Sequence, residues 1–366
     1  FGRPSTKPAR RVGERVSDFG FDQQGRFNRQ IITDLLRGHF KFDGVVLSDW
    51  GIVNDCDSRC EQGLTQEEVN AGVSPWTVPF GMSWGVEKLT KAERYAKAID
   101  AGVDQFGGVE DPAPLLAAVQ SGLVTEAAIT TSAERILAQK FALGLFENPY
   151  VDAEAAVALV GKAEFQQEAQ AAQAASHVLL KNEGALLPLK ADGKRVYLHN
   201  VNAEVARANG YTVVTNLADA ELAIVRVNAP GEQDPRFPFG SIHFGQLGFA
   251  SNDQVVQETA HEGVYRGADD YAAIQAIEQA GVPLVLSVYL DRPAILTEVA
   301  PAARVLLANF GALDQALFDV MSGTQKARGK LPFELPSSWQ AVLAQSPDVA
   351  KDSQSPLYPY GAGLAY

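Results

Sequence analysis

A carboxylate and an aromatic ring follow one another at Asp49 and Trp50, directly after an apolar run. The run Val45–Leu47 favours a buried parallel strand, and Gly51 allows the backbone to turn after it. An ionised carboxylate beside an aromatic face suits a site that cleaves sugars, and such groups gather at the carboxyl ends of the strands in β/α barrels. An aspartate after a strand also commonly caps a helix or forms a turn. The surrounding sequence is therefore needed to distinguish a catalytic role from a structural one.

The elements around Asp49 alternate as they do in a β/α barrel. Helical spacing of apolar residues predicts a helix over residues 27–38, followed by the Asp49 strand within residues 42–51. A stretch rich in Gly, Pro and polar residues runs on to Trp84, and long loops after strands are usually functional. We expect further elements as follows: a helix over 89–101, a strand over 102–108, and helices over 115–119 and 129–143. This pattern predicts part of a barrel, because two strands cannot close one.

A second alternation of strands and helices begins after residues 151–165, which we interpret as a linker. An alanine-rich helix over 166–176 leads into a strand at Val178–Glu183. Short apolar runs with helices between some of them predict an α/β domain with a largely parallel sheet. The runs are Val196–Leu198, Val213–Val214, Leu222–Val227, Leu284–Leu290 and Val305–Ala308, and the helices are Asp270–Ala280 and Leu313–Ser322.

An irregular polar span lies between Ala229 and Tyr271. It is too polar to be a core and too long to be a simple connection, so we interpret it as a functional loop. Its charged and titratable residues are Glu232, Asp234, Arg236, His243, Glu258, His261, Glu262 and Arg266.

The composition limits the partners of the chain. A net charge of −13 over 366 residues argues against nucleic acid or an anionic membrane as partner, because both are negatively charged. No apolar run approaches the roughly 18 residues that a membrane span needs. The chain begins at Phe1 without an initiator methionine, so we expect a processed or truncated N-terminus with sequence missing upstream.

The two cysteines, Cys56 and Cys60, lie four residues apart in the loop after Asp49. They are either two unpaired thiols or a small disulfide that braces the loop, and no further zinc ligands lie nearby. A disulfide would indicate a protein that works outside the cytosol.

The motifs of several enzyme classes are absent from the sequence. It contains no Gly-x-Gly-x-x-Gly, phosphate loop, His-Glu-x-x-His or Gly-x-Ser-x-Gly, which argues against redox enzymes with dinucleotides, kinases, zinc proteases and serine hydrolases. The five histidines are scattered, so we interpret each as a surface or hydrogen-bonded residue rather than a ligand. The reaction expected below requires no cofactor or metal.

Several blocks of sequence together resemble glycoside hydrolase family 3, in the order in which that family carries them. The resemblance covers nearly the whole chain. The blocks are Phe42–Gly51, Ala98–Asp104, Arg135–Leu137, Lys140–Asp152, Val178–Glu183, Leu186–Leu189, Val288–Pro293, Ala308–Gly311, Gly329–Pro336 and Tyr358–Tyr366.

The resemblance implies an α/β fold in which the C-terminal part of a β/α (TIM-like) barrel is followed by an α/β sandwich. Residues 1–150 would be the barrel part with the nucleophile, 151–165 the linker, and 166–366 the sandwich with the acid/base loop. The Lys-His block that the family carries on earlier barrel strands is absent, so the remaining barrel half would come from another chain or segment.

The resemblance also implies the site residues of a retaining glycosidase. Asp49 matches the nucleophile of the family, and Trp50 would form part of the wall that binds the sugar. Glu262, in His261-Glu262-Gly263, resembles the block that supplies the acid/base, with Glu258 and Glu232 as alternatives. The two carboxyl groups of such an enzyme lie about 5–5.5 Å apart and need different environments.

The implied function is that of an exo-acting β-glucosidase, which removes terminal β-D-glucosyl residues from β-glucosides or oligosaccharides by double displacement. The alternatives are a β-xylosidase of the same family and a non-catalytic carbohydrate-binding fragment. We also expect a periplasmic or secreted location and a possible homodimer.

Overall fold

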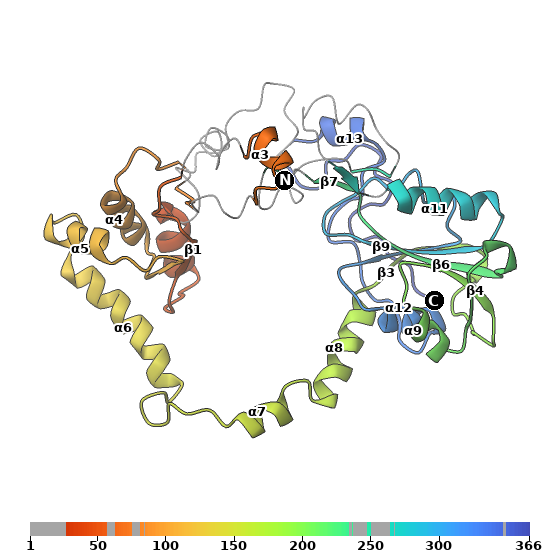
Figure 1. Ribbon diagram of the computed structural model, residues 1–366, viewed down its shortest axis with the longest axis horizontal. Helices are drawn as coiled ribbons and strands as arrows, with labels where there is room; N and C mark the ends of the chain where they lie inside the picture. The colour runs from red at the N-terminus through yellow and green to blue at the C-terminus, as the bar shows by residue number, and fades with distance from the viewer. Residues whose placement is uncertain are drawn as a thin grey trace. The chain divides into compact units, whose positions relative to one another are not determined.

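The computed structural model describes residues 27–56, 63–74, 81–83, 85–233, 236, 247–249, 264–266, 268–346 and 349–366. The chain divides into two compact units. The N-terminal unit comprises residues 7–153 and 235–238, and the C-terminal unit comprises residues 154–234 and 239–366. Figure 1 shows the helices and strands of both units and labels most of them.

The C-terminal unit is built on a six-stranded sheet in the order β3-β10-β9-β6-β4-β5. Strand β3 runs antiparallel to β10, and the other neighbours are parallel to each other. The strands are β3 (Val178–Asn182), β4 (Arg195–His199), β5 (Thr212–Val214), β6 (Leu222–Asn228), β9 (Leu284–Tyr289) and β10 (Val305–Asn309). The prediction of an α/β fold with a largely parallel sheet is confirmed.

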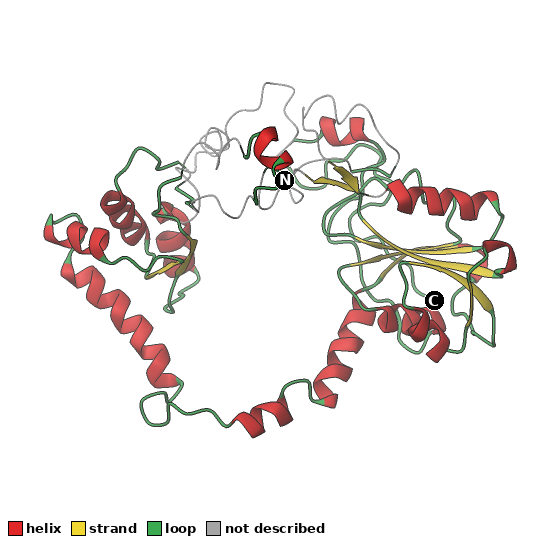
Figure 2. Ribbon diagram, in the orientation of Figure 1, coloured by secondary structure: helices red, strands yellow, loops and turns green. Residues whose placement is uncertain are grey.

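Both faces of this sheet are buried, because alternate residues of each strand enter different cores. In β6, Ala223 and Val225 belong to one core, whereas Leu222 and Ile224 belong to the other. Figures 1 and 2 show α11 on one face of the sheet and α9 and α12 on the other. The helices of the unit are α8 (Ala163–Ser176), α9 (Ala203–Ala208), α11 (Ala268–Gln279), α12 (Asp314–Ser322) and α13 (Trp339–Ala344), with short 3-10 turns η4 (Glu183–Ala185) and η5 (Leu217–Asp219).

The polar span after Ala229 begins and ends in a small antiparallel hairpin. Strand β7 (Gly231–Gln233) pairs with β8 (Val264–Arg266), and Gly231 lies opposite Arg266. Between the two strands, Leu247–Phe249 is described, and Gly248 forms a parallel bridge with Ile295. Its described residues therefore close the span at its base and attach it to the unit at Gly248.

The N-terminal unit contains one pair of parallel strands, β1 (Leu47–Trp50) and β2 (Gln105–Gly107). Its apolar core includes Ile52, Tyr95 and Val103. The helices are η2 (Gln30–His39), α3 (Gln66–Asn70), α4 (Lys91–Ala101), α5 (Ala113–Gln120) and α6 (Glu126–Ala142). Helix α4 connects the two strands, so the pair forms a β-α-β unit.

Two elements of the N-terminal unit differ from the sequence-based predictions. The predicted strand within residues 42–51 is shorter, because the Val46 N–H donates to the Asp104 carboxylate rather than to a neighbouring strand. The predicted helix over 27–38 is a π-helix that extends to His39, and the Phe40 N–H donates to the Leu35 carbonyl five residues back.

The expected linker, residues 151–165, is partly helical. It contains α7 (Ala153–Leu159) and the start of α8, and all residues of α7 are exposed. In the described part of the chain, no helix combines the length and apolarity that crossing a bilayer requires.

Candidate active site

Asp49 lies on β1, with its side chain exposed. Its Oδ1 accepts a hydrogen bond from the Trp50 N–H at 2.7 Å. The preceding hydroxyl, that of the buried Ser48, donates to the Asp49 carbonyl at 2.7 Å and accepts from the Gly107 N–H at 3.1 Å. Strand β1 therefore presents an exposed carboxylate on a backbone that is tied to β2.

The Trp50 indole packs over two glycines at the end of β2. A Cβ atom at Gly107 would lie 2.8 Å from Trp50 Cε3, and one at Gly108 would lie 2.2 Å from Trp50 Cδ1. Gly108 also has φ +61°, a conformation that favours glycine. The other side of the indole is open, since Trp50 is 55% exposed. Trp50 thus offers a fixed aromatic face next to the Asp49 carboxylate.

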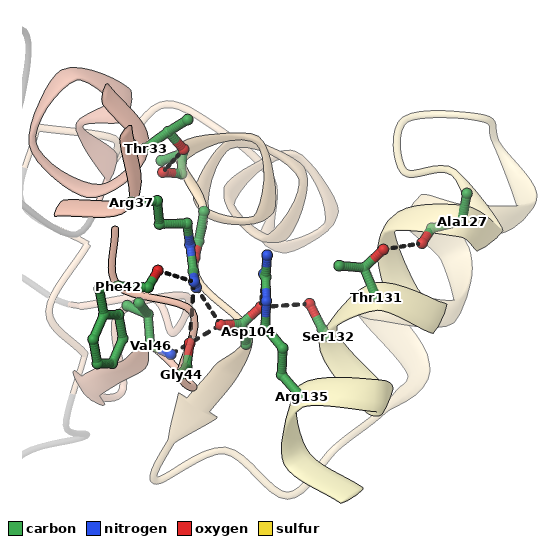
Figure 3. A network of polar contacts seen from close by, with 12 residues as sticks. Thr33, Arg37, Phe42, Gly44, Val46, Asp104, Ala127, Thr131, Ser132 and Arg135 are labelled. Carbon is green, nitrogen blue, oxygen red and sulfur yellow. Dashed lines mark hydrogen bonds and ion pairs between the residues drawn. The ribbon is translucent and has the colours of Figure 1, made fainter. Parts of the chain in front are cut away.

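A buried carboxylate, Asp104, holds the start of β1. Asp104 Oδ2 accepts from the Val46 N–H at 2.9 Å and pairs with Arg37, whereas Oδ1 accepts from Arg135 Nη1 at 2.7 Å and from Ser132 Oγ at 3.0 Å. The side chain of Asp104 is 1% exposed. Figure 3 shows η2, the start of β1 and α6 converging on this group.

The surroundings of Asp104 favour its ionised form. Burial raises the pKa of Asp104, but the hydrogen bonds from Val46, Arg135 and Ser132 and the charge of Arg37 outweigh it and lower the pKa below the ordinary value. Arg37 also donates to the Gly44 carbonyl at 3.0 Å and the Gly102 carbonyl at 3.1 Å. This network, which we call the Asp104 clamp, sets the position of β1 relative to β2 and α6.

A buried arginine, Arg94 on α4, holds the loop that follows β1. Its guanidinium donates to the Val53 carbonyl at 3.1 Å, the Glu87 carbonyl at 2.8 Å and the Asp55 carboxylate at 2.7 Å. The two ends of the loop are also joined directly, because the N–H of Met82 donates to the carbonyl of Gly51 at 3.0 Å. The long polar stretch after Trp50 is thus closed at its base, beside the candidate nucleophile.

Parts of this long loop are ordered by local interactions. Helix α3 begins at Thr65, which forms a capping box with Glu68. Cys56 is disulfide-bonded, and Cys60, the other cysteine of the chain, lies outside the described residues. The disulfide interpretation of the cysteines is therefore confirmed, and that of two unpaired thiols is wrong.

The expected acid/base residue lies outside the part of the chain that the structure describes. This holds for Glu262 and for its alternative Glu258. The third candidate, Glu232, lies on β7 opposite Tyr265 of β8. These glutamates stay predictions, and so do the roles of Asp49 and Trp50 in chemistry.

Sequence reasoning missed the residues that position Asp49. Asp104 ends one of the blocks that resemble family 3, and Gly107 and Gly108 end the second predicted strand. Their positions could therefore be read from the sequence, but their contacts with β1 and Trp50 could not. Arg94 carried no signal, because an arginine on an amphipathic helix is usually exposed. Among the described residues, no group of three or more His, Cys, Asp or Glu side chains is arranged to hold a metal ion.

Comparison with known proteins places these observations in a family. The sequence profile of the Glycosyl hydrolase family 3 C-terminal domain matches residues 177–366. A periplasmic beta-glucosidase/beta-xylosidase of Dickeya chrysanthemi is 48% identical over 343 residues, which cover 93% of this chain and 48% of that protein. Beta-glucosidase C of Emericella nidulans is 36% identical over 360 residues, which cover 98% of this chain and 52% of that protein.

Solved structures show the same fold. The beta-glucosidase of Listeria innocua, in complex with isofagomine, superimposes with a TM-score of 0.63 at 21% identity and covers 93% of this chain and 50% of that one. The chain thus spans about half the length of the curated relatives and solved structures it matches. On the profile match and these relatives, the chain belongs to glycosyl hydrolase family 3.

Proposed function

We propose that the protein is a retaining, exo-acting β-glucosidase that hydrolyses terminal non-reducing β-D-glucosyl residues. The observation that carries this proposal is the exposed Asp49 carboxylate on a parallel strand, next to the open face of Trp50. The names of the relatives support the same activity, because both are described as beta-glucosidases.

In the proposed reaction, Asp49 attacks the anomeric carbon of the sugar while the bond from that carbon to the leaving oxygen breaks. Glu262 gives its proton to the leaving oxygen, which departs as an alcohol or a sugar. Glu262 then takes a proton from water, the water oxygen attacks the anomeric carbon, and Asp49 is released as a carboxylate. The net change is hydrolysis with retained configuration, and no cofactor takes part.

We further propose that residues 1–150 are the C-terminal part of a β/α barrel and that residues 166–366 form the sandwich domain. The β1-α4-β2 unit supports this, because a parallel pair needs neighbours that bury both of its faces. Leu47 on β1 is 48% exposed, and Phe40 after η2 is 66% exposed. The remaining barrel strands would come from another chain or segment and would cover these residues.

The loop between β7 and β8 supplies Glu262 in this proposal. Arg236 of that loop belongs to the same compact unit as Asp49, and its carbonyl accepts a hydrogen bond from the Leu64 N–H at 3.0 Å. Arg236 thus contacts the long polar stretch after Trp50 within that unit.

A β-xylosidase is the second candidate, because the Dickeya chrysanthemi relative is named for both activities. The two sugars differ in the C6 hydroxymethyl group of glucose. The ratio of kcat/KM for 4-nitrophenyl β-glucoside and β-xyloside separates the two activities.

The proposed location is the periplasm or the cell exterior. The disulfide at Cys56 supports it, because such bonds persist in oxidising compartments. The printed name of the Dickeya chrysanthemi relative contains the word periplasmic, which agrees with this location.

The test is mechanism-based labelling with 2,4-dinitrophenyl 2-deoxy-2-fluoro-β-glucoside, followed by peptide mapping of every chain in the preparation. We expect one label, on Asp49, and none after substitution of Asp49 by asparagine. A label on another carboxylate would overturn the assignment of the nucleophile. Binding of glucose without turnover or labelling by the glucoside or the corresponding xyloside would support a non-catalytic carbohydrate-binding protein instead.

A further inference from the structure

The pairing of β1 with β2 contains one extra residue on the β1 side, immediately before Trp50. Leu47 lies opposite Gln105. The next pair is Trp50 with Gly107, so β1 advances three residues where β2 advances two. Such a two-against-one step is a β-bulge, which is uncommon between parallel strands and is often found next to active sites, where it redirects a side chain. The extra residue falls within Ser48–Asp49, at the candidate nucleophile.

The Ser48 hydroxyl lies at this bulge and joins the two strands there. Its Oγ accepts a hydrogen bond from the Gly107 N–H at 3.1 Å and donates one to the Asp49 carbonyl at 2.7 Å. In a regular ladder, a backbone N–H of one strand donates directly to a carbonyl of the neighbouring strand. Here the serine side chain links such groups, so it connects β2 to the residue that the bulge displaces.

The contact made by Ser48 is buried, whereas the side chains that follow it are exposed. Ser48 is 6% exposed, and both Asp49 and Trp50 are exposed on the same strand. Successive side chains of a regular strand point to opposite faces of the sheet. A bulge interrupts this alternation and bends the strand. It thus allows a carboxylate and an indole that are neighbours in the sequence to be open to the same ligand.

A register without the bulge would place the candidate nucleophile differently. Regular pairing throughout β1 would set Asp49, rather than Trp50, opposite Gly107, and a shift of one residue turns a side chain to the other face of the sheet. The end of β1 is fixed, because the Trp50 indole packs on Gly107 and the Gly51 N–H donates to the Gly107 carbonyl at 2.9 Å. The Ser48 hydroxyl holds the displaced residue just before this end.

We propose that Ser48 is a positioning residue for the nucleophile: by joining the Gly107 N–H to the Asp49 carbonyl, its hydroxyl holds the β1 bulge and aims the Asp49 carboxylate at the anomeric carbon. The inference rests on the proposed glycosidase function and deepens it. Attack on carbon needs the carboxylate oxygen in a near-attack geometry, where a misplacement of about 1 Å can cost on the order of 100-fold in rate. A buried hydroxyl with two hydrogen bonds supplies the required rigidity on a strand of four residues.

Labelling by 2,4-dinitrophenyl 2-deoxy-2-fluoro-β-glucoside separates positioning of the nucleophile from stability. In the labelling step, the Asp49 carboxylate forms an ester bond to the anomeric carbon, and the bond from that carbon to the leaving oxygen breaks. The dinitrophenolate departs without a proton from the acid, so the rate reports on the nucleophile. Loss of folded protein lowers the number of labelled molecules, whereas a misplaced carboxylate lowers the rate constant for labelling.

The experiment measures three quantities in the whole protein and its variants: the rate constant for labelling, the inactivator concentration that gives half the maximal rate, and the number of labels per molecule. For Ser48→Ala we expect a rate constant lower by about tenfold or more, an unchanged half-saturating concentration and one label per folded molecule. Ser48→Thr keeps the hydroxyl and should recover most of the rate.

Ser287→Ala is the matched control, because Ser287 is also a buried serine on a parallel strand, β9 of the C-terminal unit. Its hydroxyl accepts a hydrogen bond from the Asn309 side chain at 3.0 Å. We expect a lower denaturation midpoint for this variant and labelling kinetics like those of the wild type. Equal slowing of labelling in Ser48→Ala and Ser287→Ala would overturn the proposal.

Hydrogen exchange of the Gly107 amide tests the contact independently of activity. We expect slow exchange in the wild type and in Ser48→Thr, and faster exchange in Ser48→Ala, because the amide then loses its acceptor. The proposal would be overturned by unchanged exchange or an unchanged labelling rate constant in Ser48→Ala, with or without fewer labels, and by equally slow labelling of Ser48→Thr. A wild-type protein that is not labelled, although its Gly107 amide exchanges slowly, would instead contradict the proposed function.

Discussion

The six-stranded sheet and the β1–β2 pair are held in place by different forces. In the C-terminal unit, the central strands β6, β9 and β10 are buried on both faces, and their register follows from the apolar residues that enter the two cores. In the N-terminal unit, β1 and β2 have four and three residues, and their side chains contribute little to a core. The Asp104 clamp and Arg94 hold this pair instead.

The difference corresponds to what each unit presents. A strand buried on both faces is stable but has no side chain free to meet a substrate. Strand β1 keeps Asp49 and Trp50 exposed, so its position has to be set at its ends, by Asp104 before it and Arg94 after it. Polar contacts thus hold the candidate active strand in position, whereas apolar packing holds the central strands of the six-stranded sheet.

The largest expected effect is on activity. Substitution of Asp49 by glycine should lower kcat on aryl β-glucosides by more than about 1,000-fold, because the nucleophile is lost, and leave the denaturation midpoint unchanged. Added azide should restore turnover and give the α-glycosyl azide, which mass spectrometry and NMR identify. Asp43→Gly removes an exposed aspartate from the same segment and should keep wild-type kcat. Comparable losses in both variants would contradict the assigned role of Asp49.

The second effect compares buried carboxylates of the two units. Asp104→Asn leaves Arg37 and Arg135 without their anion and should destabilise the N-terminal unit by about 3–5 kcal/mol. Asp319→Asn is the counterpart in the C-terminal unit, where, among the described residues, the Asp319 carboxylate accepts from the amides of Gln170 and Gln315. It should cost about 1 kcal/mol.

Hydrogen–deuterium exchange measures the stability of each unit separately in the two variants. Fast exchange confined to peptides of the N-terminal unit is expected for Asp104→Asn. Equal losses of stability in the two variants would contradict the comparison. The ion pairs of Asp104 with arginines would then stabilise the fold no more than the hydrogen bonds of Asp319 with glutamine amides.

The third effect tests the glycines below Trp50. Gly108→Ala should raise KM for aryl β-glucosides by about fivefold, because the added methyl displaces the indole and a stacking contact is worth about 1 kcal/mol. Gly122→Ala is the control, since Gly122 has φ +78° and nothing within 4 Å of an added Cβ atom. Both variants should lose about 1 kcal/mol of stability from backbone strain, but only the first should change KM.

The smallest effect concerns pH and Glu298, whose carboxylate lies against Gly248. Burial raises the pKa of Glu298, which outweighs the opposing hydrogen bonds from Glu298 and Phe249 amides. The folded protein therefore binds this proton more tightly than the unfolded chain does. The resulting stabilisation is complete below the unfolded pKa of about 4.3 and is lost as the pH rises through the folded value.

Glu298→Gln removes this dependence on pH. The free energy of unfolding of the variant relative to the wild type should increase between pH 4 and pH 8, as measured by denaturant titration at each pH. A constant difference would show that the desolvation of Glu298 has no energetic consequence. Glu278→Gln, which removes an exposed carboxylate on α11, should show no such trend.

Much of the C-terminal unit could be predicted from local sequence. The predicted strands at Leu222–Val227 and Val305–Ala308 differ from β6 and β10 by one residue at the C-terminal end. Val305–Ala308 is apolar throughout and Leu222–Val227 is apolar except for Arg226, and such runs are typical of buried strands in parallel sheets. The short helices α9 and α13 were missed, because six residues are too few for a helical period to show.

The sequence alone indicated the candidate residues for the chemistry and determined the order in which most of the elements follow. Asp49 and Trp50 stand out from the apolar run before them, and the family blocks identify the fold. Only the tertiary structure decided how these residues are held: the length of β1, the Asp104 clamp and the glycines below Trp50. The reason is physical, since each depends on groups that are far apart in the chain and meet only when it is folded. Local spacing carries no information about them.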